Sequence, residues 1–137
     1  MRVAVISIPA GNGAKLSVLA QGLGKGLEAA GHRVDHFGPK VDPMAMASYD
    51  YLVVGTESSG PWGRLPQAVG TYLRRCQGLG GKRSFAFVRK SGLMPAKLLS
   101  RLMRVLEGEG LLITFEEMFS GAEDAAAAGR EAPVERA

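Results

Sequence analysis

The chain has 137 residues, of which 46% are hydrophobic and 22% charged, so it suits one globular domain and is too apolar for a disordered chain. No apolar run reaches the roughly 18 to 20 residues that a membrane-spanning helix needs. The single cysteine, Cys76, excludes an internal disulfide framework and a cysteine-cluster metal site. The apolar run at residues 2–8 lacks the flanks of an export signal, so we expect a cytoplasmic protein with no membrane contact.

The net charge of +4, from 17 cationic and 13 acidic side chains, is concentrated in the middle of the chain. Residues 64–104 hold no carboxylate, whereas the tail after Gly121 is mildly acidic. A segment of one sign attracts anions, which include phosphate groups, acidic proteins and nucleic acids. The alternative is that these cations stand on outward helix faces and serve only solubility. The cations of the segment are Arg64, Arg74, Arg75, Lys82, Arg83, Arg89, Lys90, Lys97, Arg101 and Arg104.

The first half of the chain predicts strands at residues 2–8, 32–37 and 51–55, the first of them a β-branched run typical of a strand buried on both faces. Between the first two strands, apolar residues recur at helical spacing. They are Leu16, Leu19, Ala20, Leu23 and Leu27. This helix holds Gly22, Gly24 and Gly26, which we expect to be close-packing sites against the sheet. Asp42-Pro43 is a helix-start signal for one or two turns before the third strand.

The second half continues the alternation, with strands predicted at residues 84–88 and 111–119. The helix before the first of them has one apolar face. This face holds Leu65, Val69, Tyr72, Leu73 and Cys76. The helix after it has a second apolar stripe and stops at Gly110. That stripe holds Leu98, Leu99, Leu102, Met103 and Leu106. Five strands alternating with helices predict an α/β fold, a three-layer arrangement with a parallel sheet covered on both faces.

The last segment, residues 121–137, is alanine-rich and mildly acidic, so we expect the domain to span residues 1–120 and the rest to be a short, partly disordered tail. A three-layer sheet needs a last helix over the face that it shares with the first helix. Either residues 122–128 form a short substitute, or apolar sheet surface remains for a neighbouring chain. Exposed apolar surface of that kind predicts a homodimer or a higher oligomer.

The loops after the first, third and fourth strands are the expected ligand site, because parallel sheets bind ligands beyond the carboxyl ends of their strands. The first loop, residues 9–15, leads into a helix N-terminus whose unpaired amides suit a phosphate. Gly11 and Gly13 let the backbone approach an anion closely. The loop lacks the Gly-Lys-Ser/Thr ending of nucleotide hydrolases.

The other two loops add an aromatic ring and positive charge to the same rim. Trp62, the only tryptophan, either stacks on a planar ligand or covers the sheet edge. Glu57 is the only carboxylate expected at the rim, and accepting a loop amide suits it better than general acid–base catalysis. In the fourth loop Arg89 and Lys90 contribute two cations and Ser91 a hydroxyl group.

Four stretches of the sequence resemble the flavodoxin-like family over residues 1 to about 120. They are the run Y-D-Y-L-V-V-G-T at residues 49–56, Gly60, the run L-G-G-K at residues 79–82, and Gly11-Asn12. The resemblance implies five parallel strands in the order 2-1-3-4-5 and a flavin mononucleotide (FMN) site at the three loops. The residues that would bind FMN are Ala10, Gly11, Asn12, Gly13, Lys15, Thr56, Ser58, Ser59, Trp62, Gly63, Arg89, Ser91 and Gly92.

The first loop departs from the family pattern Ser-x-Thr-Gly-x-Thr, because Ile8, Ala10 and Gly13 stand where the hydroxyl side chains are expected. Each lost charge-assisted hydrogen bond removes on the order of 1.5–3 kcal/mol, so two losses weaken phosphate binding by roughly 100-fold. Arg89 and Lys90 would favour the anionic, fully reduced flavin through Coulomb attraction, and so raise the second reduction potential.

Two functions therefore remain open. The first is an FMN-binding electron carrier or flavin-dependent redox component, and Trp62 favours this function. It would work with a redox partner protein, and the basic segment is compatible with an acidic partner. The second is a flavodoxin-like binding or assembly module that has lost FMN, which the missing hydroxyl groups favour. An electron carrier is expected rather than a stand-alone catalyst, since the flavin itself does the chemistry.

Other chemistry finds little support in the sequence. His32 and His36 flank a predicted strand and would lie roughly 13 Å apart, too far to share one metal ion. Cys76 on an apolar helix face has the profile of a buried, inert thiol. A nucleic-acid partner is not expected, since the basic segment has no recognised binding motif and little aromatic interleaving.

Overall fold

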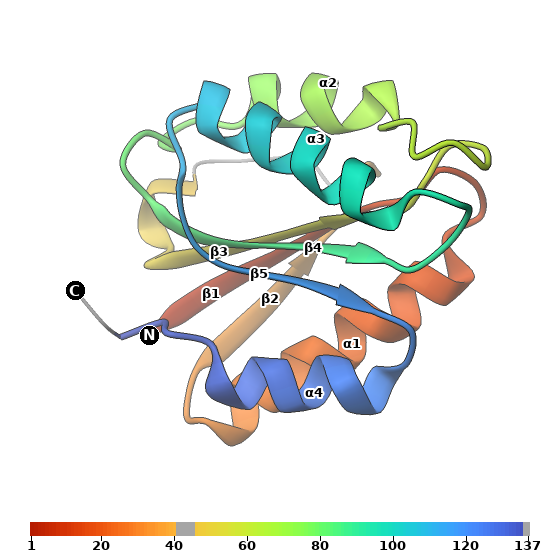
Figure 1. Ribbon diagram of the computed structural model, residues 1–137. Helices are drawn as coiled ribbons and strands as arrows, with labels where there is room; N and C mark the ends of the chain where they lie inside the picture. Colours follow the sequence, from red (N-terminus) through yellow and green to blue (C-terminus); the bar gives the residue numbers. More distant parts are fainter. Residues whose placement is uncertain (41–45, 136–137) are drawn as a thin grey trace.

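A parallel five-stranded sheet with helices on both faces is the frame of the molecule (Figure 1). The computed structural model describes residues 1–40 and 46–135, so the helix start predicted at Asp42-Pro43 lies outside the described residues. The strands are β1 (Arg2–Ile8), β2 (Arg33–Phe37), β3 (Tyr51–Thr56), β4 (Arg83–Arg89) and β5 (Leu112–Phe119). The helices are α1 (Ala14–Ala29), the short 3-10 helix η1 (Met46–Ser48), α2 (Gln67–Arg75), α3 (Pro95–Gly108) and α4 (Ala122–Glu131). The order β2-β1-β3-β4-β5, all parallel, confirms the predicted topology.

Helix α2 is shorter than its apolar spacing predicts. Pro66 precedes it with extended backbone (φ −59°, ψ 136°), and Cys76 follows it with φ −73° and ψ 146°. Leu65 and Cys76 therefore lie outside the helix, although both still pack against the core beneath it. A proline just before a helix is compatible with its start, because the first amides of a helix have no intrahelical acceptor.

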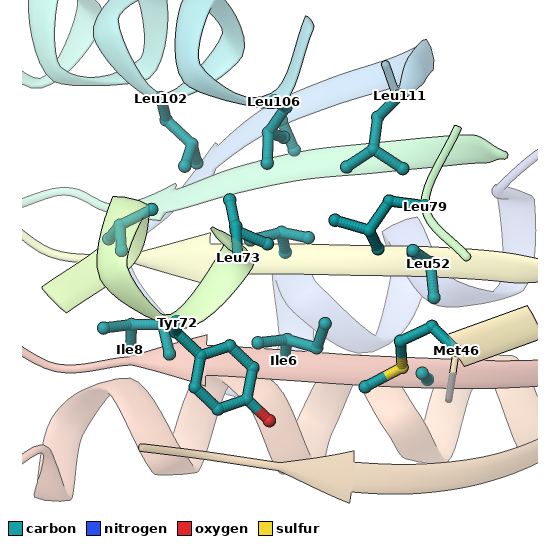
Figure 2. Close-up of a cluster of buried hydrophobic side chains, with 14 of the residues drawn as sticks. Ile6, Ile8, Met46, Leu52, Tyr72, Leu73, Leu79, Leu102, Leu106 and Leu111 are labelled. Atoms are coloured by element: carbon teal, nitrogen blue, oxygen red, sulfur yellow. The ribbon is translucent and has the colours of Figure 1, made fainter. Parts of the chain in front are cut away.

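Each face of the sheet carries its own apolar core. Because side chains alternate along a strand, Val3 and Val5 of β1 point to one face and Ile6 and Ile8 to the other. Helices α2 and α3 cover the second face, and Figure 1 shows both on the same side of the sheet. The side chains that meet in this core include Ile6, Ile8, Leu52, Tyr72, Leu73, Leu102 and Leu106 (Figure 2).

Helix α4 covers the opposite face together with α1 (Figure 1). Its Ala125 and Ala128 are buried in the same core as Leu23 of α1, and Val134 beyond the helix is only 1% exposed. Residues 122–134 are thus part of the domain, which corrects the boundary predicted at residue 120. Helix α4 covers the sheet face whose expected exposure favoured a homodimer, so the homodimer stays a prediction without this support.

The glycines of α1 allow α4 to approach it very closely. A Cβ atom on Gly26 would lie 2.0 Å from the carbonyl oxygen of Ala126, and one on Gly129 would lie 2.4 Å from that of Leu23. Gly22 likewise faces α4, whereas Gly24 faces β2. The predicted close packing is therefore present, but two of the three α1 glycines pack against a helix and not against the sheet.

Candidate functional site

A cleft opens where the strand order reverses, between β1 and β3. The chain leaves β1 toward α1 on one face and leaves β3 toward α2 on the other, so the two loops separate above the sheet. The cleft has a volume of about 480 Å³ and is completed by the end of β4. The residues that line it are Ala10, Gly11, Asn12, Gly13, Ala14, Lys15, Glu57, Ser58, Ser59, Gly60 and Arg89.

The loop after β1 presents backbone to this cleft. Gly13 precedes α1 with φ +77°, and a Cβ atom there would lie 2.8 Å from Cβ of Pro9, so a side chain is excluded. Asn12 Oδ1 accepts a hydrogen bond from the Ala14 amide at 3.0 Å. Nothing lies within 4 Å of a Cβ atom built on Gly11. The conformation of the loop therefore depends on the left-handed backbone of Gly13 and on the Asn12–Ala14 hydrogen bond. The backbone around Gly11 is open to a ligand.

Thr56 takes a structural role beneath the cleft. It is fully buried, and its hydroxyl group donates to the carbonyl oxygen of Ile8 at 2.6 Å. This bond holds the ends of β1 and β3 together at the point where Ile8 and Thr56 are paired in the sheet. Thr56 does not line the cleft.

Glu57 connects all three loops of the site. It is 5% exposed; its Oε2 accepts a hydrogen bond from the Ala10 amide at 3.0 Å, and its Oε1 lies 2.8 Å from Nε of Arg89. The loop-amide bond is the role that the sequence predicted for this carboxylate. The ion pair was not predicted, and it means that Arg89 does not present an uncompensated charge; of the two cations predicted for this loop, Lys90 is the exposed one.

The loops after β3 and β4 contact each other directly beside the cleft. The Leu93 amide donates to the carbonyl oxygen of Pro61 at 2.7 Å, and Gly92 lies against the same carbonyl group. Arg101 of α3 donates from Nη1 to the carbonyl oxygen of Gly63 at 2.6 Å. Trp62, held between these contacts, is 65% exposed.

The structure thus divides the predicted site residues into two groups. Those brought together around the cleft are Ala10, Gly11, Asn12, Gly13, Lys15, Ser58, Ser59 and Arg89. Those placed outside its lining are Thr56, Trp62, Gly63, Ser91 and Gly92. Glu57 was expected at the rim but not among the residues that would bind FMN, although its place directly after the most apolar strand was a usable signal. Ala14 and Gly60 were also omitted.

Cys76 and the histidines lie away from this site. Cys76 Sγ lies 3.5 Å from the carbonyl oxygen of Tyr72, to which the thiol donates, and burial raises the pKa of the thiol to about 11 from the ordinary value of 9.0. Within residues 1–40 and 46–135, no group of three or more His, Cys, Asp or Glu side chains could hold a metal ion. In the same ranges no helix is both long and apolar enough to cross a bilayer.

The raised pKa of Cys76 predicts that its thiol reacts slowly in the folded protein. At pH 8 the thiolate population should be about 100-fold lower than for an ordinary cysteine. The reaction rate should fall by about the same factor, because only the thiolate reacts. Reaction with a chromogenic disulfide, followed with and without denaturant, measures the difference. Equal rates in the folded and unfolded protein would contradict the assignment of an inert thiol.

Comparison with solved structures finds flavodoxins with a similar fold. No protein-family model matches the sequence, and no curated protein matches it. Two-electron reduced flavodoxin from Megasphaera elsdenii superposes with a TM-score of 0.72 at 16% identity, over 94% of this chain and 99% of that one. Flavodoxin from Streptococcus pneumoniae TIGR4 gives 0.67 at 20% identity, over 94% and 95% of the two chains. Oxidised Flavodoxin 1 from Bacillus cereus gives 0.66 at 15% identity, over 94% and 95%.

These likenesses span nearly the whole chain, so the protein has the flavodoxin-like fold. At this level of sequence identity the comparison concerns the architecture, and the five-stranded order agrees with it. The fold that the sequence resemblance implied is confirmed.

Proposed function

We propose that this protein binds FMN in the cleft formed by the loops after β1, β3 and β4, and that it acts as an electron carrier or flavin-dependent redox component. The observation that carries the proposal is the position of the cleft, which lies at the reversal of strand order and at the N-terminus of α1. The likeness of the fold to that of solved flavodoxins supports it.

The residues around the cleft fit a phosphorylated ligand. A Cβ atom built on Gly11 or on Gly60 would meet nothing within 4 Å, so main chain on both sides of the cleft is accessible. The backbone of Gly11 to Gly13 and the ammonium group of Lys15 would hold the phosphate, which also gains from the dipole of α1. No hydroxyl side chain is available from this loop, because residues 9–15 contain no serine, threonine or tyrosine.

The planar part of FMN would lie beside Ser58, Ser59 and Gly60, next to Arg89. The direct contact between Pro61 and Leu93 closes the space between the loops after β3 and β4. When bound, FMN supplies electron transfer, and the protein needs no acid–base residue of its own for that step. Glu57 holds the Ala10 loop and Arg89 in position, and its own charge is balanced by the guanidinium group.

A fluorescence titration of FMN with the purified protein tests the proposal. We expect quenching of flavin emission, and we expect Lys15→Ala to weaken binding by about tenfold, because it removes a charge-assisted contact to the phosphate. Lys25→Ala is the matched control: it removes an exposed cation from the same helix outside the cleft, and should leave the affinity unchanged. Protein that leaves millimolar FMN unquenched contradicts the proposal.

The second candidate function is a binding or assembly module without flavin. The specific observation in its favour is the first loop, where a left-handed glycine and a buried isoleucine replace hydroxyl side chains. This function predicts no quenching of FMN together with preserved binding of a protein partner. The same titration, combined with the partner experiment below, separates the two functions.

A further inference from the structure

Two neighbouring loops expose large apolar side chains at one end of the molecule. Trp62, Leu93 and Met94 are 65%, 68% and 37% exposed. They account for half of the large hydrophobic side chains that are exposed in the described part of the chain; the others are Met1, Val18 and Leu112. The loops that carry them follow β3 and β4, adjacent parallel strands that end at the same edge of the sheet (Figure 1).

These apolar side chains stand on a braced backbone. Leu93 donates its amide to Pro61 at 2.7 Å, and Arg101 donates to Gly63 at 2.6 Å. Gly63 and Gly92 both have φ of +70°, and a Cβ atom on either would lie within 3 Å of a carbonyl oxygen of the other loop. A rigid apolar surface loses little conformational entropy when a partner binds, so its exposure favours recognition.

Cations accompany the apolar side chains. Arg64, Lys90 and Lys97 are exposed, and each lies within three residues of Trp62, Leu93 or Met94 in the sequence. The one carboxylate of these loops, Glu57, is buried against Arg89. The carboxylates that begin α4, at Glu123 and Asp124, belong to the helix layer on the other face of the sheet (Figure 1). These two loops and the first turn of α3 therefore expose three large apolar side chains and three cations, while their one carboxylate is buried.

We propose that Trp62, Leu93 and Met94, with Arg64, Lys90 and Lys97, form a docking surface for an acidic protein segment that carries apolar side chains. Interfaces are enriched in aromatic residues, methionine and arginine, and tryptophan is a frequent source of binding energy. Opposite charges at the margin steer association and select the partner. Single-stranded nucleic acid would require a series of stacking aromatic rings, and this surface has one.

The purpose of this docking surface rests on the proposed function, because an electron carrier needs a redox partner. Docking itself does not require FMN. The surface adjoins the cleft because Ser58, Ser59 and Gly60 line the cleft and Trp62 follows two residues later. A partner on this surface would therefore sit beside a bound flavin.

Labelled peptides test the surface without a known partner. We use a glutamate-rich peptide with leucines, the same peptide with serines for leucines, and a lysine-rich peptide with leucines, each followed by fluorescence anisotropy. The acidic leucine peptide is expected to bind, and the other two to bind at least tenfold more weakly. Its affinity should fall as salt is raised. Emission of Trp62, the only tryptophan, should change on binding and so locate the site.

The variant Lys90→Glu/Lys97→Glu is expected to weaken binding of the acidic leucine peptide by at least tenfold, and Trp62→Ala should do the same. Lys25→Glu/Arg33→Glu is the matched control: it makes the same change of net charge at exposed sites, Lys25 on α1 and Arg33 on β2, and should leave binding unchanged. The titrations are run with and without FMN, so a protein that ignores FMN but binds the peptide rejects the proposed function and keeps the docking surface. Equal loss in the control variant, preference for the lysine-rich peptide, or binding only to anionic vesicles or duplex DNA overturns the proposal.

Discussion

Gly26→Ala is expected to destabilise the fold by about 3 kcal/mol or more, the upper end of what overpacking costs. The new methyl group would lie 2.0 Å from the carbonyl oxygen of Ala126 and 3.0 Å from the amide nitrogen of Arg130, both in the backbone of α4. Main chain cannot rotate away as a side chain can, so α1 and α4 must separate and expose the core between them. Urea denaturation followed by circular dichroism measures the loss.

Gly24→Ala provides the control for this result within the same helix. Its methyl group would lie 2.8 Å from the end of the His36 ring, and His36 is exposed and free to choose another rotamer. Alanine is favoured over glycine in a helix by about 1 kcal/mol, and both variants share this gain. We therefore expect Gly24→Ala to be neutral or stabilising. Equal losses in the two variants would show that close approach of α4 is not the reason for glycine at residue 26.

The layers of the fold could be predicted from the sequence because buried positions recur at a regular spacing in strands and helices. The apolar run of β1 and the helical stripe of α1 each require a sheet covered on both sides. The sequence did not identify the partner of the α1 glycines, since a glycine signals close approach without saying to what. It left open whether the alanine-rich residues 122–128 form the missing helix or leave apolar sheet surface exposed, and the packing of Gly26 against Ala126 shows why small residues suffice.

The sequence predicted where the cleft lies but not the contacts within it. Strand order alone places the loops after β1, β3 and β4 together. From the sequence, Arg89 was expected to be a free cation. In the register of β3 and β4, Thr56 lies opposite Val88, and this brings the next residues, Glu57 and Arg89, side by side. Register is not readable from one sequence. Nor is the exposure of Trp62, which depends on how the two loops fold against each other at Pro61 and Leu93.

Glu57→Ala is expected to destabilise the protein by about 3 kcal/mol, toward the lower end of the cost of breaking a buried ion pair. It leaves the Ala10 amide without its acceptor and the Arg89 guanidinium without its carboxylate, in a site where the Glu57 side chain is 7% exposed. Arg89 is 23% exposed, so water reaches part of its charge and limits the loss. Denaturant titration of the variant measures it.

Glu57→Gln separates the structural role of this side chain from its charge. The amide oxygen of glutamine can still accept from the Ala10 amide, so the loss of stability should be smaller than for alanine. The net charge of the cleft, however, becomes more positive by one, because Arg89 remains without its counter-ion, and anionic FMN should therefore bind about tenfold more tightly. A variant that is stable yet binds FMN no better than the unaltered protein would show that the charge of Glu57 does not act on bound FMN. Weaker binding would instead mean that the orientation of Arg89 by the carboxylate matters more than the net charge of the cleft.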